Sequence, residues 1–379
     1  MSGGMELYLH MPFCVRKCAY CDFLSFPSGA KTQRMYAKRL MEDIGVMGKR
    51  YGEIPVETIF IGGGTPSVPD SGLIVEIMEH VRHAFHVADG AEISMEANPG
   101  TVTREKLTDY RKAGINRLSF GLQSANDREL KLLGRIHTWA EFLESFTLAR
   151  ECGFANLNID LMSALPGQTC ESWKETLSRV TDLDPGHISA YSLIIEEGTP
   201  FGERYGSEEG RKLLPDEDSE REMYHETKRF LKDCGYERYE ISNYAKPGRE
   251  CRHNIGYWTG VPYLGLGLGA SSYLDGCRFT VNPDMKQYLE EKPGMFTDIE
   301  KLTKKDMEEE FFYVGLRMTA GVSLSEFERR FGISAKEVYP GLMETFVKEK
   351  AARFEGDRFV LTDYGLDVSN YIMAQFLQD

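Results

Sequence analysis

The sequence predicts an α/β protein: an open, partial (β/α)6 barrel of the TIM-like type, followed by a small helical, winged-helix-like C-terminal domain. From residue 5 to about residue 195, strand-like runs alternate with amphipathic helix-like runs, the order expected of a parallel sheet wrapped by helices. Six such units are too few to close an eight-stranded barrel. The last part of the chain, from residue 301 onward, changes character and contains helices followed by a hairpin.

The strand-like runs are apolar and short, and each precedes a stretch with apolar residues at helical spacing. The predicted strands are residues 6–10, 56–61, 93–97, 117–122, 157–161 and 188–194. The predicted helices between them include residues 33–47, 73–85, 104–112 and 142–150. In such sheets the chemistry gathers at the carboxyl ends of the strands, so the segments there form the candidate site.

The first strand leads into a loop with three cysteines in C-x3-C-x2-C spacing, Cys14, Cys18 and Cys21. Three soft thiolates suit an iron–sulfur cluster or zinc. Structural zinc sites use four protein ligands, and no second Cys or His pair lies nearby in the sequence. A [4Fe-4S] cluster on three cysteines leaves one iron open. The alternative is three unrelated cysteines, which their clustering around Tyr20 disfavours.

The later strands also end in polar or glycine-rich segments. Glycines after the second strand let the backbone approach a ligand closely. Any one of these residues could instead be a turn or helix-cap residue. Together they predict a ligand pocket at one rim of the sheet. The segments are residues 62–67, 96–99, 121–124, 158–160 and 165–169.

The cysteine loop resembles the radical SAM signature. Tyr8, His10, GGGTPS at 62–67, EANP at 96–99, SFGLQS at 119–124, LGRIH at 133–137 and NIDL at 158–161 are similar to motifs of the HemN-like coproporphyrinogen dehydrogenase family, over nearly the whole chain. The resemblance implies a [4Fe-4S] cluster whose open iron binds the amino and carboxylate groups of S-adenosylmethionine (SAM). Cleavage of SAM there gives methionine and a 5'-deoxyadenosyl radical, which abstracts hydrogen from a substrate.

The resemblance also implies a set of SAM contacts, carried over by position. In the dehydrogenases some of these residues serve a second SAM, and the sequence leaves open whether this chain holds one molecule or two. The contacts are Tyr8, Tyr20, Gly63, Gly64, Thr65, Glu96, Gln123, Arg135, Asp160 and Ile194.

Two features distinguish a branch of the family. The dehydrogenases carry a fourth cysteine two residues after the third, where this chain has Phe23; the ending Cys21-Asp22-Phe23 is similar to the HemW heme chaperone branch. The segment CRHNIGYW at 251–258 matches the HNxxYW motif of that branch. Neutral imidazole is a common heme ligand, so the resemblance implies His253 as a ligand, with Cys251 as the competing ligand. The alternative is that His253 only stabilises a turn.

We therefore expect a heme chaperone that binds heme and transfers it to an acceptor protein, and that contains a [4Fe-4S] cluster and SAM. The competing interpretation is an oxygen-independent coproporphyrinogen III oxidase or dehydrogenase. A methyltransferase with two SAM molecules ranks third. The sequence does not name the acceptor, decide whether SAM is cleaved or the protein is an enzyme, or distinguish a monomer from a homodimer.

Three segments are predicted: a barrel with the cluster loop at 1–235, an accessory α/β segment with the HNxxYW motif at 236–300, and a HemN-like C-terminal domain at 301–379. Residues 198–218 are predicted to be a long loop, 220–234 a helix and 239–244 a strand. The Gly-Leu alternation at 263–270 indicates close backbone packing rather than a nucleotide loop. Helices at 304–318, 324–331 and 335–350 precede a hairpin that turns at Gly356.

Composition excludes several partners. The 379 residues include 45 basic and 59 acidic side chains, a net charge of -14, which opposes binding to nucleic acid. Residues 301–379 carry 11 basic and 14 acidic side chains, which disfavours a DNA-binding winged helix. No apolar run approaches the roughly 18 residues of a membrane span, and residues 1–4 lack the features of a signal peptide. Three of the eight cysteines lie together in one loop and the other five are far apart, which does not suggest a disulfide framework. Because free thiols persist in reducing compartments, we expect a cytoplasmic protein.

Overall fold

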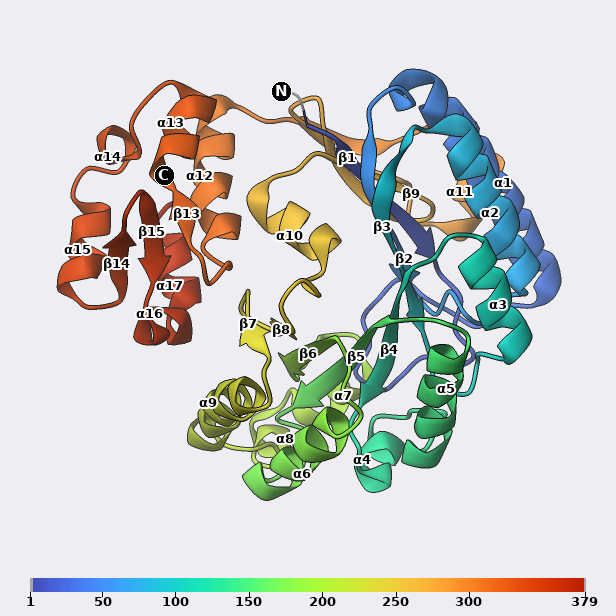
Figure 1. The fold of residues 1–379 in the computed structure, drawn as a ribbon, viewed down its shortest axis with the longest axis horizontal. Coiled ribbons are helices and arrows are strands. Elements are labelled where there is room, and N and C mark those ends of the chain that lie inside the picture. The colour runs from blue at the N-terminus through green and yellow to red at the C-terminus, as the bar shows by residue number, and fades with distance from the viewer. Residues whose placement is uncertain (1–2, 378–379) are drawn as a thin grey trace.

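The protein is organised around one curved sheet of twelve strands, shown in Figure 1 for the computed structural model, which describes residues 3–377. The six central strands are parallel and lie in sequence order, as the sequence predicts. They are β1 (Met5–Met11), β2 (Val56–Gly63), β3 (Val87–Ala97), β4 (Arg117–Gln123), β5 (Asn156–Ser163) and β6 (His187–Ser192).

Helices cover the outer face of this sheet (Figure 1). They are α1 (Ala30–Tyr51), α2 (Ser71–Ala84), α3 (Arg104–Lys112), α4 (Asp127–Leu132), α5 (Trp139–Glu151) and α6 (Cys170–Thr181). Side-chain caps such as Asp70 and Thr103 accept hydrogen bonds from the first turns and so fix where the helices begin. Leu7 and Leu9 of β1 are fully buried and share the main apolar core with Leu40 of α1.

The inner face of the same strands is largely polar, because successive side chains of a strand point to opposite faces. In β1, Glu6, Tyr8 and His10 alternate with Leu7 and Leu9. The inside of the barrel is therefore a hydrogen-bonding surface rather than a second apolar core. Buried polar residues of the other strands include Thr58, Glu92, Ser94, Arg117, Ser119, Asn158, His187 and Ser189.

Short strands extend the sheet at both edges. Beside β1 lie β9 (Tyr263–Leu266), β10 (Ser271–Leu274), β11 (Cys277–Thr280) and β12 (Thr297–Lys301), and beside β6 lie β8 (Asn243–Ala245) and β7 (Glu237–Arg238). β9 is parallel to β1, whereas β8 is antiparallel to β6. Residues 236–300 thus contribute to the same sheet as the barrel strands, and the division into three segments stays a prediction.

The single strand predicted at 239–244 is wrong. Between β7 and β8 the chain leaves the ladder, and the Ser242 N–H is bound by the Glu240 carboxylate at 2.8 Å instead of by a neighbouring strand. Close backbone packing at 263–270 is confirmed, because a Cβ on Gly265 would lie 2.2 Å from the Ser271 carbonyl oxygen.

The long loop predicted at 198–218 is also wrong, because the segment contains α7 (Pro200–Tyr205) and α8 (Glu208–Arg211). Thr199 caps α7, and Pro200 occupies its first turn, where the missing N–H costs nothing. Phe201 and Tyr205, one turn apart, are both buried. Pro200 and Gly206, which are typical of loops, therefore stand at the first turn and the C-cap of α7. The predicted helix at 220–234 is present as α9 (Glu217–Asp233).

The C-terminal residues form a separate core around a three-stranded sheet. The hairpin is confirmed and turns at Gly356, but the helix predicted at 335–350 is broken, because Pro340 lacks an N–H and Gly341 has φ of +74°. The elements are α12 (Lys304–Gly315), β13 (Val322–Ser323), α13 (Leu324–Phe331), α14 (Ala335–Val338), α15 (Leu342–Lys348), β14 (Ala352–Glu355), β15 (Arg358–Leu361), α16 (Asp363–Asp367) and α17 (Ser369–Ala374).

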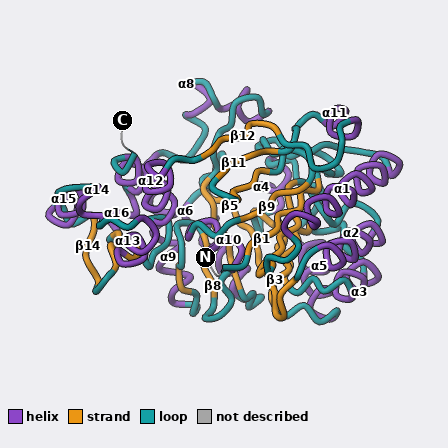
Figure 2. The backbone as a smooth tube through the Cα atoms, turned by 90° about the horizontal axis from the view of Figure 1, so that it is seen from above, coloured by secondary structure: helices purple, strands orange, loops and turns teal. Residues whose placement is uncertain are grey.

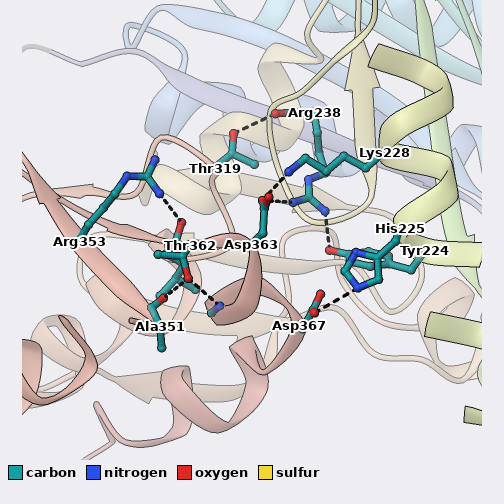
Figure 3. A network of polar contacts seen from close by, with 12 residues as sticks. Tyr224, His225, Lys228, Arg238, Thr319, Ala351, Arg353, Thr362, Asp363 and Asp367 are labelled. Atoms are coloured by element: carbon teal, nitrogen blue, oxygen red, sulfur yellow. Dashed lines mark hydrogen bonds and ion pairs between the residues drawn. The ribbon is translucent and has the colours of Figure 1, made fainter. Parts of the chain in front are cut away.

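This C-terminal domain lies at one end of the molecule, away from α1 and α2 at the other end (Figure 2). It is joined to α9 largely through polar contacts (Figure 3). Lys228 pairs with Asp363, and His225 Nε2 lies 3.2 Å from an Asp367 oxygen. The Asp363 side chain is exposed, and ion pairs of such side chains contribute little stability. Packing of α12 against α10 (Arg252–Thr259) also holds the domain.

The HNxxYW segment forms α10, a helix and not the turn considered from the sequence. A left-handed residue, Gly260 with φ of +70°, ends it. α11 (Met285–Glu290) completes the elements between the barrel and the C-terminal domain. Among residues 3–377, no helix has the length and apolar character needed to cross a bilayer. Met1 and Ser2, part of the N-terminus judged to lack a signal peptide, lie outside the described residues.

Candidate cluster and cofactor site

The cysteine loop stands at the carboxyl end of β1 and is anchored where it leaves the strand and where it returns. The Cys14 N–H donates to the Phe26 carbonyl at 3.1 Å, and the Phe26 N–H donates to the Pro12 carbonyl at 2.9 Å. Cys14, Cys18 and Cys21 carry free thiols and are half-buried. The base of the loop is therefore fixed while its thiols stay partly accessible.

A segment after α4 holds the tip of the loop. Arg16 donates to the Gly134 carbonyl at 2.8 Å, and Arg135 donates in return to Cys18 Sγ at 3.4 Å. The sequence predicted Arg135 as a site residue but missed Arg16. No local pattern signals Arg16, since its partner lies 118 positions away in the chain.

Gly63 and Gly64 are required by close packing against β1 and its loop. Gly63 has φ of +107°, and a Cβ there would lie 2.3 Å from His10 Cε1. A Cβ on Gly64 would lie 2.7 Å from the nearest carbonyl oxygen of β1. Thr65 follows directly, with its Oγ1 3.5 Å from Cys14 Sγ. The glycines thus bring the end of β2 against the cysteine loop.

The main-chain N–H groups of residues 63–65 are all used within the protein. They donate to Glu96 Oε2 at 3.0 Å, to the Met11 carbonyl at 2.9 Å and to the Phe13 carbonyl at 2.7 Å. With these hydrogen bonds in place, main-chain contact from this segment to a ligand has to come from carbonyl oxygens. Such acceptors suit an amino group, which donates.

Two carboxyl groups interact at this rim, one from β3 and one from β5. Burial raises the pKa of Glu96 to about 8, and the nearby charge of Asp160 raises it too, while the Gly63 N–H opposes this. Burial also raises the pKa of Asp160, against hydrogen bonds from Ser119 at 2.9 Å and Asn158 at 2.8 Å. Near neutral pH, Glu96 is therefore mostly protonated unless a cation binds beside it.

His10 connects the cysteine loop to Tyr8, although it was not among the predicted site residues. His10 Nε2 lies 2.9 Å from the Leu24 carbonyl, which can only accept, so Nε2 carries the proton. The Tyr8 hydroxyl then donates to His10 Nδ1 at 3.0 Å. Burial lowers the pKa of His10, which keeps the ring neutral. The signal that could have found His10 is its place two residues after Tyr8 on the inner face.

The remaining predicted contacts surround the same end of the barrel. Tyr20 packs against Phe201, with 6.5 Å between ring centroids. Gln123 ends β4 with φ of +75°, a left-handed conformation that is uncommon for residues other than glycine. Ile194 lies beyond the end of β6 and is 68% exposed. The assignment of these residues as SAM contacts stays a prediction.

His253 lies near the amino ends of the strands, away from the cysteine loop. Its Nδ1 is 2.6 Å from Thr58 Oγ1, its Nε2 is 2.9 Å from Tyr257 Oη, and its ring stacks on Phe60. The side chain is 1% exposed, and burial lowers its pKa to about 3. Both ring nitrogens are engaged inside the protein, so the predicted role as a heme ligand requires one of these hydrogen bonds to open.

The neighbours of His253 are covered as well. Cys251 is buried with its Sγ 3.4 Å from Glu92 Oε1, and burial raises the pKa of this thiol to about 12. Trp258 lies under Arg317 of the C-terminal domain, at 4.4 Å from the guanidinium carbon to the ring centroid. The HNxxYW helix is therefore packed between the barrel and the C-terminal domain.

The three thiols fit an iron–sulfur cluster. Among residues 3–377, no three Cys, His, Asp or Glu side chains, these thiols included, gather closely enough to hold a single metal ion, whereas in a cluster each cysteine binds a different iron. Thiolates are the ligands of a [4Fe-4S] cluster, and Arg135 and Thr65 place donor groups next to two of the three sulfurs. Cys14, Cys18 and Cys21 are therefore the residues suited to hold such a cluster.

Comparison with known proteins identifies two family models in the chain. Residues 8–180 match the radical SAM superfamily, and residues 302–368 match the HemN C-terminal domain. A solved structure described as the radical SAM enzyme coproporphyrinogen III oxidase (HemN) from Escherichia coli superimposes with a TM-score of 0.85 and 23% identity. It covers 100% of this chain and 91% of the other, which confirms the predicted fold class.

Curated relatives match over almost their full length. The chain is 34% identical over 374 residues to the heme chaperone HemW of Bacillus subtilis, covering 98% of both chains. It is 34% identical over 382 residues to the heme chaperone HemW of Escherichia coli, covering 99% of this chain and 98% of the relative. The HemW protein of Haemophilus influenzae is 35% identical over 390 residues, covering 99% and 98%.

Proposed function

Because the chain belongs to the HemW family of radical SAM proteins, we propose that it is a heme chaperone, which binds heme and transfers it to an acceptor protein. The observation that carries the proposal is the full-length similarity to proteins named heme chaperone. The cysteine loop supports it, since Phe23, 62% exposed, stands where the HemN-like dehydrogenases have a fourth cysteine.

Cys14, Cys18 and Cys21 hold a [4Fe-4S] cluster in this proposal, and SAM binds beside them. The cluster supplies an open iron for the amino and carboxylate groups of SAM and an electron for its reduction. The Gly63 and Gly64 carbonyl oxygens would accept from the amino group, because the Thr65 carbonyl already accepts from the Val68 N–H at 2.9 Å. The SAM contacts proposed around it are Tyr8, Tyr20, Gly63, Gly64, Thr65, Glu96, Gln123, Arg135, Asp160 and Ile194.

The pair Glu96 and Asp160 explains how the site accepts a cationic cofactor. A buried positive charge stabilises a neighbouring carboxylate, so SAM binding lowers the pKa of Glu96 from about 8 and releases its proton. Without SAM, Glu96 stays protonated and so repels Asp160 less than a carboxylate would. SAM uptake is accordingly coupled to proton release below pH 8.

The heme site is proposed at the HNxxYW helix, with His253 as the ligand. In the described conformation the two ring nitrogens of His253 are hydrogen-bonded to Thr58 and Tyr257. One of these hydrogen bonds has to break before that nitrogen can bind heme iron. Movement of α10 would also uncover Trp258, whose flat face suits a porphyrin. We propose a cytoplasmic location, where a reducing environment keeps thiols available as ligands.

The proposal is tested with anaerobically reconstituted protein. We expect heme to bind, with a change in its absorption spectrum, and to move to apomyoglobin, used as a probe acceptor. The same preparation, given SAM, a reductant and coproporphyrinogen III, should form no protoporphyrinogen. Absence of heme binding by cluster-loaded protein, or sustained protoporphyrinogen formation, would reject the chaperone assignment.

A further inference from the structure

Arg135 reaches the cysteine loop because of how α4 ends. Gly134 takes a left-handed conformation with φ of +75°, and the Arg135 N–H returns to the Leu130 carbonyl at 2.9 Å. This helix ending, which favours glycine, reverses the chain. The side chain of Arg135 is thereby directed toward Cys18 rather than into solvent.

The guanidinium group of Arg135 is held by several fixed acceptors. One terminal nitrogen donates to Cys18 Sγ at 3.4 Å, and the other donates to Asn98 Oδ1 and to the Gly121 carbonyl. The Nε atom is buried and has no hydrogen-bond partner among residues 3–377. A cation is therefore kept in a low-dielectric position directly against one cysteine sulfur, where its charge acts more strongly than in water.

The other basic residues near the loop differ in this respect. Arg16 and Lys17 are exposed, so water and salt screen their charges. Arg16 donates to the carbonyls of Gly134 and Arg135 and so fixes the loop, with no hydrogen bond to a sulfur among residues 3–377. Arg135 combines a desolvated charge with a hydrogen bond to a predicted cluster ligand.

When a [4Fe-4S] cluster is reduced, it gains one electron from an external low-potential donor, and its sulfur atoms become more negative. Hydrogen bonds to those sulfurs and a nearby positive charge stabilise the reduced form and raise the reduction potential. Arg is always protonated, so this effect does not depend on pH. We propose that Arg135 sets the reduction potential of the cluster through its hydrogen bond to Cys18 Sγ and its fixed charge.

The proposal rests on the cluster of the proposed function, and it assigns Arg135 a role that binding SAM does not require. The test is therefore made without SAM. Midpoint potentials are measured by electron paramagnetic resonance during anaerobic redox titration of the unmutated protein, Arg135→Gln, Arg135→Lys and Arg16→Gln, each with its iron and sulfide content determined. Resonance Raman spectra report the iron–cysteine stretching frequencies.

We expect Arg135→Gln to have the most negative midpoint, Arg135→Lys an intermediate one, and Arg16→Gln that of the unmutated protein. Loss of the N–H···S hydrogen bond should also raise an iron–cysteine stretching frequency in the Arg135 variants alone. Midpoints equal to that of the unmutated protein in either cluster-loaded Arg135 variant would overturn the proposal. If Arg135→Gln does not retain its cluster, the midpoint potential of Arg135→Lys alone tests the proposal. Failure of the unmutated protein to assemble a cluster would instead reject the proposed function.

Discussion

Replacement of Glu96 by Gln should make the protein more stable at alkaline pH. Below pH 4.5 the carboxyl group is protonated in both the folded and the unfolded chain, so it has no effect on stability. Between pH 4.5 and about 8 the unfolded chain releases the proton while the folded protein retains it, and stability falls as pH rises. Gln stays neutral throughout and avoids this loss.

The size of the effect follows from the pKa. At about 1.36 kcal/mol per pH unit, a pKa moved from 4.5 to about 8 corresponds to a loss of at most about 5 kcal/mol, complete above pH 8. Part of this loss of stability comes from repulsion between the Glu96 and Asp160 carboxylates. The Gln variant keeps the charge of Asp160 but has no second charge for it to repel. The variant also loses the hydrogen bond from the Gly63 N–H to a carboxylate, which Gln replaces with an amide oxygen.

The assay is the thermal midpoint of the cluster-loaded protein without SAM, measured anaerobically at a fixed scan rate from pH 5 to pH 8.5. The difference between Glu96→Gln and the unmutated protein should grow in favour of Gln as pH rises. SAM affinity gives an independent check: below pH 8 it should increase with pH more steeply in the unmutated protein than in Glu96→Gln, by up to about tenfold more per unit. Parallel stability curves together with equal pH slopes of SAM affinity in the two proteins would refute the reasoning.

Three further predictions concern the cluster loop, α10 and the end of β2. Cys18→Ala should lose the iron of the cluster and its near-ultraviolet charge-transfer band. Cys234→Ala, at an exposed cysteine, should retain both. Equal iron content in the two variants would contradict the assignment of Cys18 as a ligand. His253→Ala should lower the free energy of unfolding by about 2–4 kcal/mol, since it leaves buried hydroxyl groups without a partner, and an unchanged heme affinity and spectrum in the folded variant would exclude it as a ligand. Gly63→Ala should reduce both the cluster content and the thermal midpoint. Gly90→Ala, also at positive φ but with open space around it, should lower only the thermal midpoint. Equal cluster content in the two variants would contradict the packing argument.

Local chemistry determined much of the fold and part of the site. The alternation of strands and helices, the cysteine spacing and the turn at Gly356 are all short-range patterns, so the sequence alone predicted the six parallel strands, the cysteine loop and the C-terminal hairpin. The sequence also placed Glu96 and Asp160 at the ends of the third and fifth strands, with one strand between them. The two side chains come to the same rim because the strands are parallel and their carboxyl ends lie at one end of the barrel.

The tertiary structure decided the features that depend on contacts between distant segments. The buried position of His253 involves a hydrogen bond to Thr58, 195 positions away, and a short segment has no intrinsic period strong enough to specify such a partner. The raised pKa of Glu96 likewise arises from burial and from Asp160, neither of which exists in the unfolded chain. The sequence supplied the donors and acceptors, and the curvature of the sheet determined which of them meet, because pairing across the barrel requires the whole fold to be in place.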